Sequence, residues 1–261
     1  PYDIAYNTYG SLNEKRDNCI LVCHALTGSQ HCSGSLNEKY GWWSNIIGPN
    51  KAIDTNEYFV ICTNVIGSAF GSTSPISKIY PKDISYRFSF PVVTISDMIK
   101  AQRILLDSLD IKQLYAIIGG SMGGMQTLSF SILYPNIAKK FIALSTTHAT
   151  SPYIIAFNKI MSEAIISDTN FDNGNYDLEY KPILNGLKIA RMIGYLHYIT
   201  KETMQNKFGR NYVNSDGLYE LFGRFEIERY LDYNGENFCN KFDPLCLLYL
   251  LKAISIYDLS Y

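Results

Sequence analysis

The segment Gly119-Gly120-Ser121-Met122-Gly123 constrains the fold more than any other part of the sequence. It follows an apolar run at 114–118, which predicts a buried strand, and it precedes residues 125–134, which predict a helix. A serine in a G-x-S-x-G pattern between a strand and a helix lies on a strained turn, whose neighbours must lack a Cβ atom so that both elements can pack closely. The turn projects the hydroxyl of Ser121 from the carboxyl edge of a sheet. The sequence therefore predicts a nucleophilic serine.

The first half of the chain alternates strand-like and helix-like segments. Short apolar runs at 20–23, 58–62, 114–118 and 141–144 predict strands that are buried on both faces of a parallel sheet. Apolar residues at helical spacing over 94–109 predict a helix between two of them. This alternation, joined by right-handed crossovers, predicts an α/β fold with a mostly parallel, doubly wound sheet.

The pattern changes after about residue 155, where strand-like runs become rare. Helical patterns at 187–200 and 245–257 are separated by clusters of Asn, Gly and Asp, and residues 168–176 predict a loop. A helical insertion after the strands of an α/β core is typical of a lid. We predict three parts: an α/β core over 1–155, a helical lid over 156–245 and the start of a return to the core over 246–261.

Charge and cysteine content exclude several classes of protein. The 261 residues include 23 basic and 24 acidic side chains, so we expect neither nucleic acid nor an anionic membrane as a partner. No apolar run is long enough to span a bilayer, and the first residues lack the pattern of a signal peptide. The six cysteines show no spacing typical of a metal site, and we expect them to be reduced in the cytoplasm.

Acyl transfer through a serine also needs two donors that stabilise the developing oxyanion. One is the amide of the residue after the nucleophile, here Met122, and the other lies in the loop after an earlier strand. Because residues 24–28 follow the strand predicted at 20–23, we assign the second donor to the amide of Leu26. We interpret His24 as a residue that shapes this loop, since the general base of this arrangement follows the serine in sequence.

Several segments along nearly the whole chain are together typical of one family. They are residues 6–10, 24–28, 54–55, 58–60, 64–67, 71–75, 97–102, 119–126, 190–191, 207–210 and 242–243. In these segments the sequence resembles the homoserine O-acetyltransferases. The resemblance implies an α/β-hydrolase fold, acetyl transfer from acetyl-CoA to L-homoserine in methionine biosynthesis, and a ping-pong mechanism through an acyl-enzyme on Ser121. It also implies that acetyl-CoA is a co-substrate, that no cofactor is bound and that the lid forms a homodimer.

The same resemblance implies that Arg191 and Tyr198 bind the substrate. They are seven residues apart on one predicted helix, so both side chains face the same way. An arginine there could pair with the carboxylate of an amino acid through two hydrogen bonds. From the pattern alone, a solvated arginine is the better interpretation of Arg191, and the resemblance reverses that preference. We interpret His197 as a surface residue of the lid.

In the α/β-hydrolase fold that the resemblance implies, the acid and the histidine of the triad follow the serine in sequence. Only two histidines follow Ser121. His148 follows the next predicted strand directly, with no strand between to supply the acid, and His197 lies within a predicted helix of the lid. The resemblance places the acid and the histidine on loops after the last strands, beyond the lid, and it matches residues 252–260 to the helix before those strands. We therefore expect that the C-terminal strands are absent and that these 261 residues alone are inactive.

Three alternatives remain open from the sequence. A related O-succinyltransferase acting on serine or homoserine differs by a few pocket side chains. An esterase of the same fold shares the nucleophile and the oxyanion hole, and differs in how the site excludes water. A non-catalytic scaffold is the third alternative.

Overall fold

The computed structural model describes four stretches of the chain, residues 2–34, 41–179, 184–214 and 219–260. The chain divides into two compact units. The first unit comprises Pro1–Ser151 together with Leu245–Tyr261, and the second comprises Pro152–Pro244. The division predicted from the sequence placed these two boundaries after residues 155 and 245.

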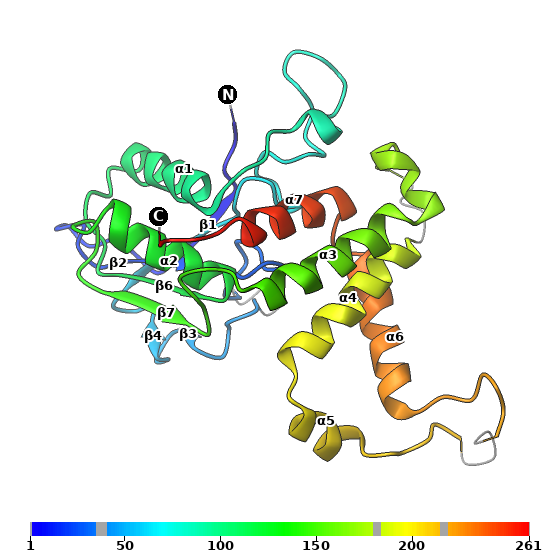
Figure 1. Cartoon of the computed structure of the whole chain (residues 1–261). Helices are drawn as coiled ribbons and strands as arrows, with labels where there is room; N and C mark the ends of the chain where they lie inside the picture. The colour runs from blue at the N-terminus through cyan, green and yellow to red at the C-terminus, as the bar shows by residue number, and fades with distance from the viewer. Residues whose placement is uncertain (1, 35–40, 180–183, 215–218, 261) are drawn as a thin grey trace. The chain divides into compact units, whose positions relative to one another are not determined.

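A five-stranded sheet forms the centre of the first unit (Figure 1). Its strands, in spatial order, are β1 (Tyr6–Tyr9), β5 (Phe59–Thr63), β2 (Cys19–Cys23), β6 (Ala116–Gly120) and β7 (Phe141–Leu144). Neighbouring strands are parallel except at the edge, where β1 runs antiparallel to β5. Every residue of β2 is buried, as expected for a strand that is covered on both faces. The mostly parallel α/β sheet predicted from the sequence is confirmed.

Different elements cover the two faces of this sheet. They are the helices α1 (Ile95–Ser108) and α2 (Met122–Leu133) on one face, and the short parallel strands β3 (Ile47–Gly48) and β4 (Ile53–Asp54) on the other (Figure 1). The side chains of β2 alternate between two hydrophobic clusters. Leu21 packs with Leu106 of α1 and Phe130 of α2, whereas Val22 packs with residues that include Ile47 of β3. Because successive side chains of a strand point to opposite faces, β2 contributes to both layers of the core.

Local interactions set the first residues of α1 and α2. Thr94 caps α1 through a capping box: its hydroxyl accepts from the amide of Asp97 at 3.1 Å, and the Asp97 carboxylate accepts from the amide of Thr94 at 2.9 Å. The helix predicted over 94–109 is therefore confirmed. Helix α2 starts at Met122, three residues before its predicted start, because the turn at Ser121 leads directly into it.

The C-terminal helix α7 (Pro244–Ser255) packs within the first unit. The phenol of Tyr249 donates to the carbonyl oxygen of Phe90 at 2.7 Å, beside the short helix η1 (Arg87–Ser89). The hydroxyl of Thr150 donates to the carbonyl oxygen of Ile254 at 2.6 Å, and the phenol of Tyr257 donates to that of Met125 at 3.1 Å. These bonds hold α7 and the residue Tyr257 that follows it against the first unit.

Strand β7 forms one edge of the sheet within the described residues. Alternate side chains of this strand, Ile142 and Leu144, are 39% and 40% exposed. Parallel strands are normally covered on both faces, so this edge is unusually apolar for a surface.

Helices form most of the described part of the second unit. They are α3 (Pro152–Ile166), η2 (Thr169–Gly174), α4 (Asn185–Tyr198), α5 (Lys201–Phe208) and α6 (Glu226–Cys239). Helix α4 packs closely on α3 because Gly186 has no side chain: a Cβ atom there would lie 2.1 Å from the carbonyl oxygen of Ala164. The helix predicted at 187–200 is confirmed. The loop predicted at 168–176 is wrong in part, since Asp168 caps a short 3₁₀ helix there.

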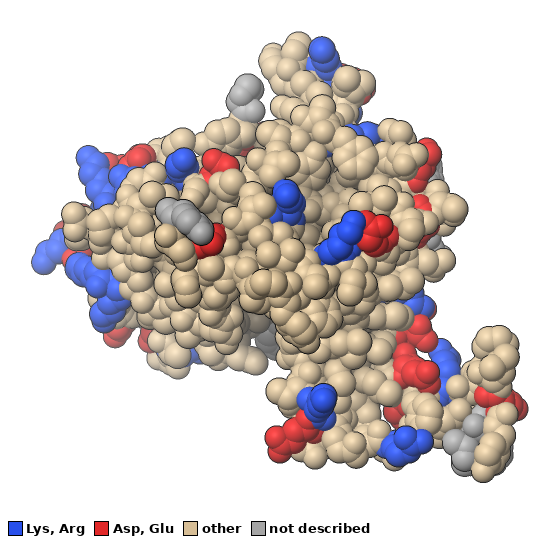
Figure 2. Space-filling view, in the orientation of Figure 1, with Lys and Arg blue, Asp and Glu red and all other residues tan. Residues whose placement is uncertain are grey.

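Charged side chains of both signs occur together on the face of the molecule drawn in Figure 2. None of the described helices combines the length and the apolar character that crossing a membrane requires.

Candidate active site

Ser121 lies on a strained turn between β6 and α2. Its backbone angles are φ 54° and ψ −121°, a region that residues with a side chain rarely adopt. The turn is fixed from three directions: the amide of Ser121 donates to Leu144, and its carbonyl oxygen accepts from the amide of Met125 and the hydroxyl of Thr146, at distances of 2.8 to 3.0 Å. The Ser121 side chain is exposed. A rigid backbone thus presents a free hydroxyl.

The glycines around Ser121 differ in whether the surrounding structure leaves space for a Cβ atom. A Cβ atom on Gly119 would lie 2.3 Å from the carbonyl oxygen of Gly123, and one on Gly123 would lie 2.1 Å from that of Cys23. At Gly124 it would lie 2.6 Å from the side chain of Thr146. Gly120 has room, since its nearest neighbour would be 3.8 Å away. The absence of a side chain is therefore required at 119, 123 and 124, and not at 120.

The two amides assigned as oxyanion donors follow adjacent parallel strands. Strand β2 pairs with β6 so that Cys23 lies opposite Gly119, which brings the loop after β2 to the same edge as Ser121. Leu26 lies in that loop, and its amide has no acceptor among the described residues. Met122 is the first residue of α2, so its amide has no intrahelical acceptor. Both amides are therefore free to donate.

His24 holds the loop that carries Leu26. It is fully buried, and its Nδ1 donates to the carbonyl oxygen of Ala25 at 2.7 Å. Its Nε2 accepts from the amide of Val65 at 3.1 Å and lies 3.3 Å from the side-chain nitrogen of Asn64. Burial lowers the pKa of His24 to about 4, so the ring is neutral near pH 7. These contacts agree with its interpretation as a residue that shapes the loop.

None of the described histidines forms a hydrogen bond with the hydroxyl of Ser121. The imidazole of His31 contacts the side chain of Asn7, and His148 is exposed after β7, where its carbonyl oxygen accepts from the amide of Leu259. In the second unit, the ring of His197 lies beside those of Tyr153 and Phe157. The described residues also contain no group of three or more His, Cys, Asp or Glu that could hold a metal ion.

Arg191 and Tyr198 lie on α4 in the second unit. The guanidinium carbon of Arg191 is 4.6 Å from the ring centre of Tyr195 and 4.8 Å from that of Phe238, and the ring of Tyr198 is at 5.9 Å. Arg191 forms no ion pair with any described carboxylate, and its buried Nε has no acceptor. Tyr198 is 55% exposed. The aromatic rings thus hold a cation whose charge is not neutralised.

Tyr195 is a residue that sequence reasoning missed. Its phenol donates to the side-chain oxygen of Asn234 at 2.7 Å on α6, and Nη2 of Arg191 lies 3.4 Å from the same phenol oxygen. Tyr195 therefore positions the guanidinium between two helices. A signal was present in the sequence, because residues 191 and 195 are one helical turn apart.

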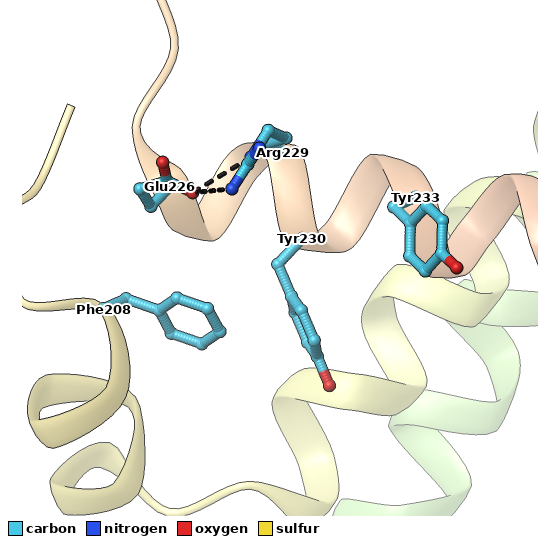
Figure 3. Close-up of a pocket in the computed structure, with 5 residues that line it drawn as sticks. All are labelled: Phe208, Glu226, Arg229, Tyr230 and Tyr233. Carbon is cyan, nitrogen blue, oxygen red and sulfur yellow. Dashed lines mark hydrogen bonds and ion pairs between the residues drawn. The ribbon is translucent and has the colours of Figure 1, made fainter. Parts of the chain in front are cut away.

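A pocket of about 240 Å³ lies between α5 and α6 in the second unit (Figure 3). The residues that line it are Phe208, Glu226, Arg229, Tyr230 and Tyr233. The ring centres of Phe208 and Tyr230 are 5.0 Å apart, and Arg229 pairs with Glu226 at 2.6 Å. None of the site residues predicted from the sequence lines this pocket.

Comparison with known proteins gives consistent matches. Residues 18–229 match the family described as alpha/beta hydrolase fold. Homoserine O-acetyltransferases from Sulfurimonas autotrophica and Nautilia profundicola are each 57% identical to the whole of this chain, which covers 72% of their length. The crystal structure of a homoserine O-acetyltransferase from Bacillus anthracis matches 99% of this chain and 71% of its own, at 28% identity and a TM-score of 0.90. The crystal structure of esterase E22 matches 98% of this chain and 72% of its own, at 31% identity and a TM-score of 0.85.

The strain at Ser121 predicts that two small substitutions differ in their effect on stability. Ser121→Gly should be more stable than Ser121→Ala by about 1 kcal/mol, because glycine adopts a positive φ without the steric cost that a Cβ atom adds. Urea unfolding of the two variants measures the difference in the free energy of unfolding. Equal stability would show that the turn is not strained.

Proposed function

The chain belongs to the α/β-hydrolase fold family and, within it, to the homoserine O-acetyltransferases, and we propose that it transfers the acetyl group of acetyl-CoA to the hydroxyl of L-homoserine. The observation that carries this proposal is 57% identity over the whole chain with two homoserine O-acetyltransferases. The exposed hydroxyl of Ser121 on its strained turn supports it, since acyl transfer needs such a nucleophile. Methionine biosynthesis is the pathway that this reaction would serve.

The proposed reaction has two steps. First, the Ser121 oxygen gives its proton to a base and attacks the thioester carbon. The resulting oxyanion accepts hydrogen bonds from the amides of Leu26 and Met122, and the carbon–sulfur bond then breaks to release CoA as the protonated thiol. Second, the homoserine hydroxyl gives its proton to the base and attacks the acyl carbon. The carbon–oxygen bond to Ser121 breaks, and the serine recovers its proton.

We propose that the general base and its acid partner come from outside residues 1–261. This rests on the positions of the four histidines, none of which forms a hydrogen bond with Ser121 among the described residues. Loss of the base costs on the order of 10⁶ in kcat in serine triads. On this proposal, residues 1–261 alone are inactive.

The proposed role of Arg191 is to bind the carboxylate of homoserine, with Tyr198 contributing its hydroxyl. Arg191 is suited to an anion because it has no carboxylate partner within the described chain, and its Nε is buried without an acceptor. A buried donor that lacks a partner costs free energy, which a bound carboxylate would recover. In this proposal the second unit is the lid of the site.

An esterase is the alternative that a specific observation favours, because the structure of esterase E22 is also similar to this chain at 31% identity. The higher identity to homoserine O-acetyltransferases favours the transferase. Succinyl-CoA as the donor or serine as the acceptor would change the substrate and not the chemistry.

We also propose that the protein is a cytoplasmic homodimer that associates through the second unit. Three large side chains next to α6 are almost fully exposed: Tyr219 at 96%, Leu221 at 89% and Phe222 at 89%. The aromatic pocket between α5 and α6 would receive apolar side chains from a second copy. The cytoplasm is supported by the six cysteines, all of which are free.

The function is tested by mixing the full-length protein with acetyl-CoA and following free thiol. We expect one acetyl group on Ser121 by intact-mass spectrometry and continuous thiol release only when L-homoserine is added, because the acyl-enzyme needs an acceptor. Ser121→Ala should abolish both. An adduct that persists on Ser121→Ala would refute the nucleophile. Release without homoserine would indicate an esterase, and absence of release would indicate a scaffold.

Arg191→Ala should raise the KM for homoserine by about 30- to 1,000-fold, which is the effect of losing a charged hydrogen-bond pair in a covered site. The KM for acetyl-CoA should change little. Arg224→Ala is the matched control, because Arg224 is an exposed arginine of the same unit whose partner is Asp232. Equal losses for both substrates would point to a folding role for Arg191.

The double variant Leu221→Lys/Phe222→Lys should halve the mass that light scattering measures for the full-length protein, because two charges would replace buried apolar contacts. Ile104→Lys is the control, since Ile104 is an exposed apolar residue of α1 in the first unit. A dimer that survives the double variant would place the interface elsewhere.

A further inference from the structure

Gln126 is a fully buried polar side chain to which the proposed mechanism gives no role. It lies on α2, one turn after Met122. Its side-chain nitrogen donates to two carbonyl oxygens, those of His24 and Met122, each at 3.3 Å. Its side-chain oxygen accepts from the side-chain nitrogen of Gln102 on α1 at 2.8 Å.

The partners fix the orientation of this amide. A carbonyl oxygen can only accept, so the two carbonyls of His24 and Met122 require the NH₂ group of Gln126. The reverse orientation would place an oxygen against these two oxygens and would remove the donor to the buried His24 carbonyl. Gln102 then has to donate, and it holds the Gln126 oxygen from the other side. The amide therefore has one stable orientation.

The two carbonyls belong to the two segments that supply the oxyanion donors. Met122 carries one proposed donor amide itself, and His24 is two residues before Leu26, which carries the other. One side-chain amide therefore joins the loop after β2 to the first turn of α2. The close contact of Gly123 with the carbonyl of Cys23 limits how near the segments come, whereas Gln126 holds them together.

We propose that Gln126 is a positioning residue that fixes the separation of the two oxyanion donors. This inference rests on the proposed function. Gln126 touches neither substrate nor the reacting atoms, and it acts through the backbones of residues 24 and 122. Because a misplacement of about 1 Å can cost about 100-fold in rate, loss of this link should affect the transition state more than the binding of substrate.

The principal test is Gln126→Met, which keeps the volume of the side chain and removes both donated hydrogen bonds. In the full-length protein we expect the rate of acylation by acetyl-CoA to fall by about 10- to 100-fold, with the KM for acetyl-CoA within about twofold of the wild type. A small alkylboronic acid, which forms a tetrahedral adduct with a nucleophilic serine, should bind correspondingly more weakly.

Two further variants separate positioning from stability. Thr127→Val removes another buried hydrogen bond of α2, from the Thr127 hydroxyl to the carbonyl of Gly123 at 3.0 Å, and keeps the bonds from Gln126 to the carbonyls of residues 24 and 122. It should lower stability and leave the acylation rate within about twofold. The Gln126→Glu side chain can donate a hydrogen bond only when its carboxyl group is protonated, so the acylation rate of this variant relative to the wild type should rise as the pH falls. This variant provides a test that does not depend on whether Gln126→Met folds.

The outcomes distinguish this inference from the function on which it rests. If Ser121→Ala is inactive while Gln126→Met acylates at the wild-type rate, the positioning role is wrong and the proposed function stands. An equal fall in rate for Thr127→Val, or a pH-independent rate ratio for Gln126→Glu, also overturns it. If Ser121→Ala still forms the acetyl adduct, the proposed function itself fails.

Discussion

The close approach of α2 to the ends of β2 and β6 is the constraint on which the rest of the structure depends. Gly123 lies against the carbonyl of Cys23, and Gly119 lies against that of Gly123, at separations that no side chain would permit. The strained backbone of Ser121 lies between these two close contacts, and the residue is exposed. The close approach also brings the loop of Leu26 beside the first turn of α2. The strained turn at Ser121 and the closeness of the two segments that carry the proposed donor amides thus go with one packing contact.

Each unit keeps a group in a state that is unfavourable for stability. In the first unit this is the positive φ of Ser121, and in the second it is the buried Nε of Arg191, which has no acceptor. Strain and unpaired polar groups persist where the surrounding structure holds them, and they occur most often where a protein binds or reacts. The rings of Tyr195 and Phe238 hold the guanidinium of Arg191 in place. The glycine contacts hold the turn at Ser121 in place.

Local patterns predicted the strands and the nucleophile, because their causes are local. Strand β7 has the predicted bounds of 141–144, since four apolar residues between turn signals allow little else. Ser121 and Met122 follow from five consecutive residues. The role of Gln126 could not be predicted, because the contact that joins it to His24 spans 102 positions in the sequence. Both are polar residues with ordinary neighbours, and only the fold shows that they meet.

The burial of His24 links the integrity of the active site to acidity. A histidine in an unfolded chain takes up a proton near pH 6.5, whereas burial lowers the pKa of His24 to about 4. The unfolded chain therefore binds the proton first, so stability is undiminished above pH 6.5 and falls as the pH drops toward 4, by on the order of 3 kcal/mol in total. Protonation of His24 would also place a proton on Nε2, so this atom could no longer accept the hydrogen bond from the amide of Val65. Acid would thus release the loop that carries Leu26, so the scaffold itself sets a lower pH limit for catalysis.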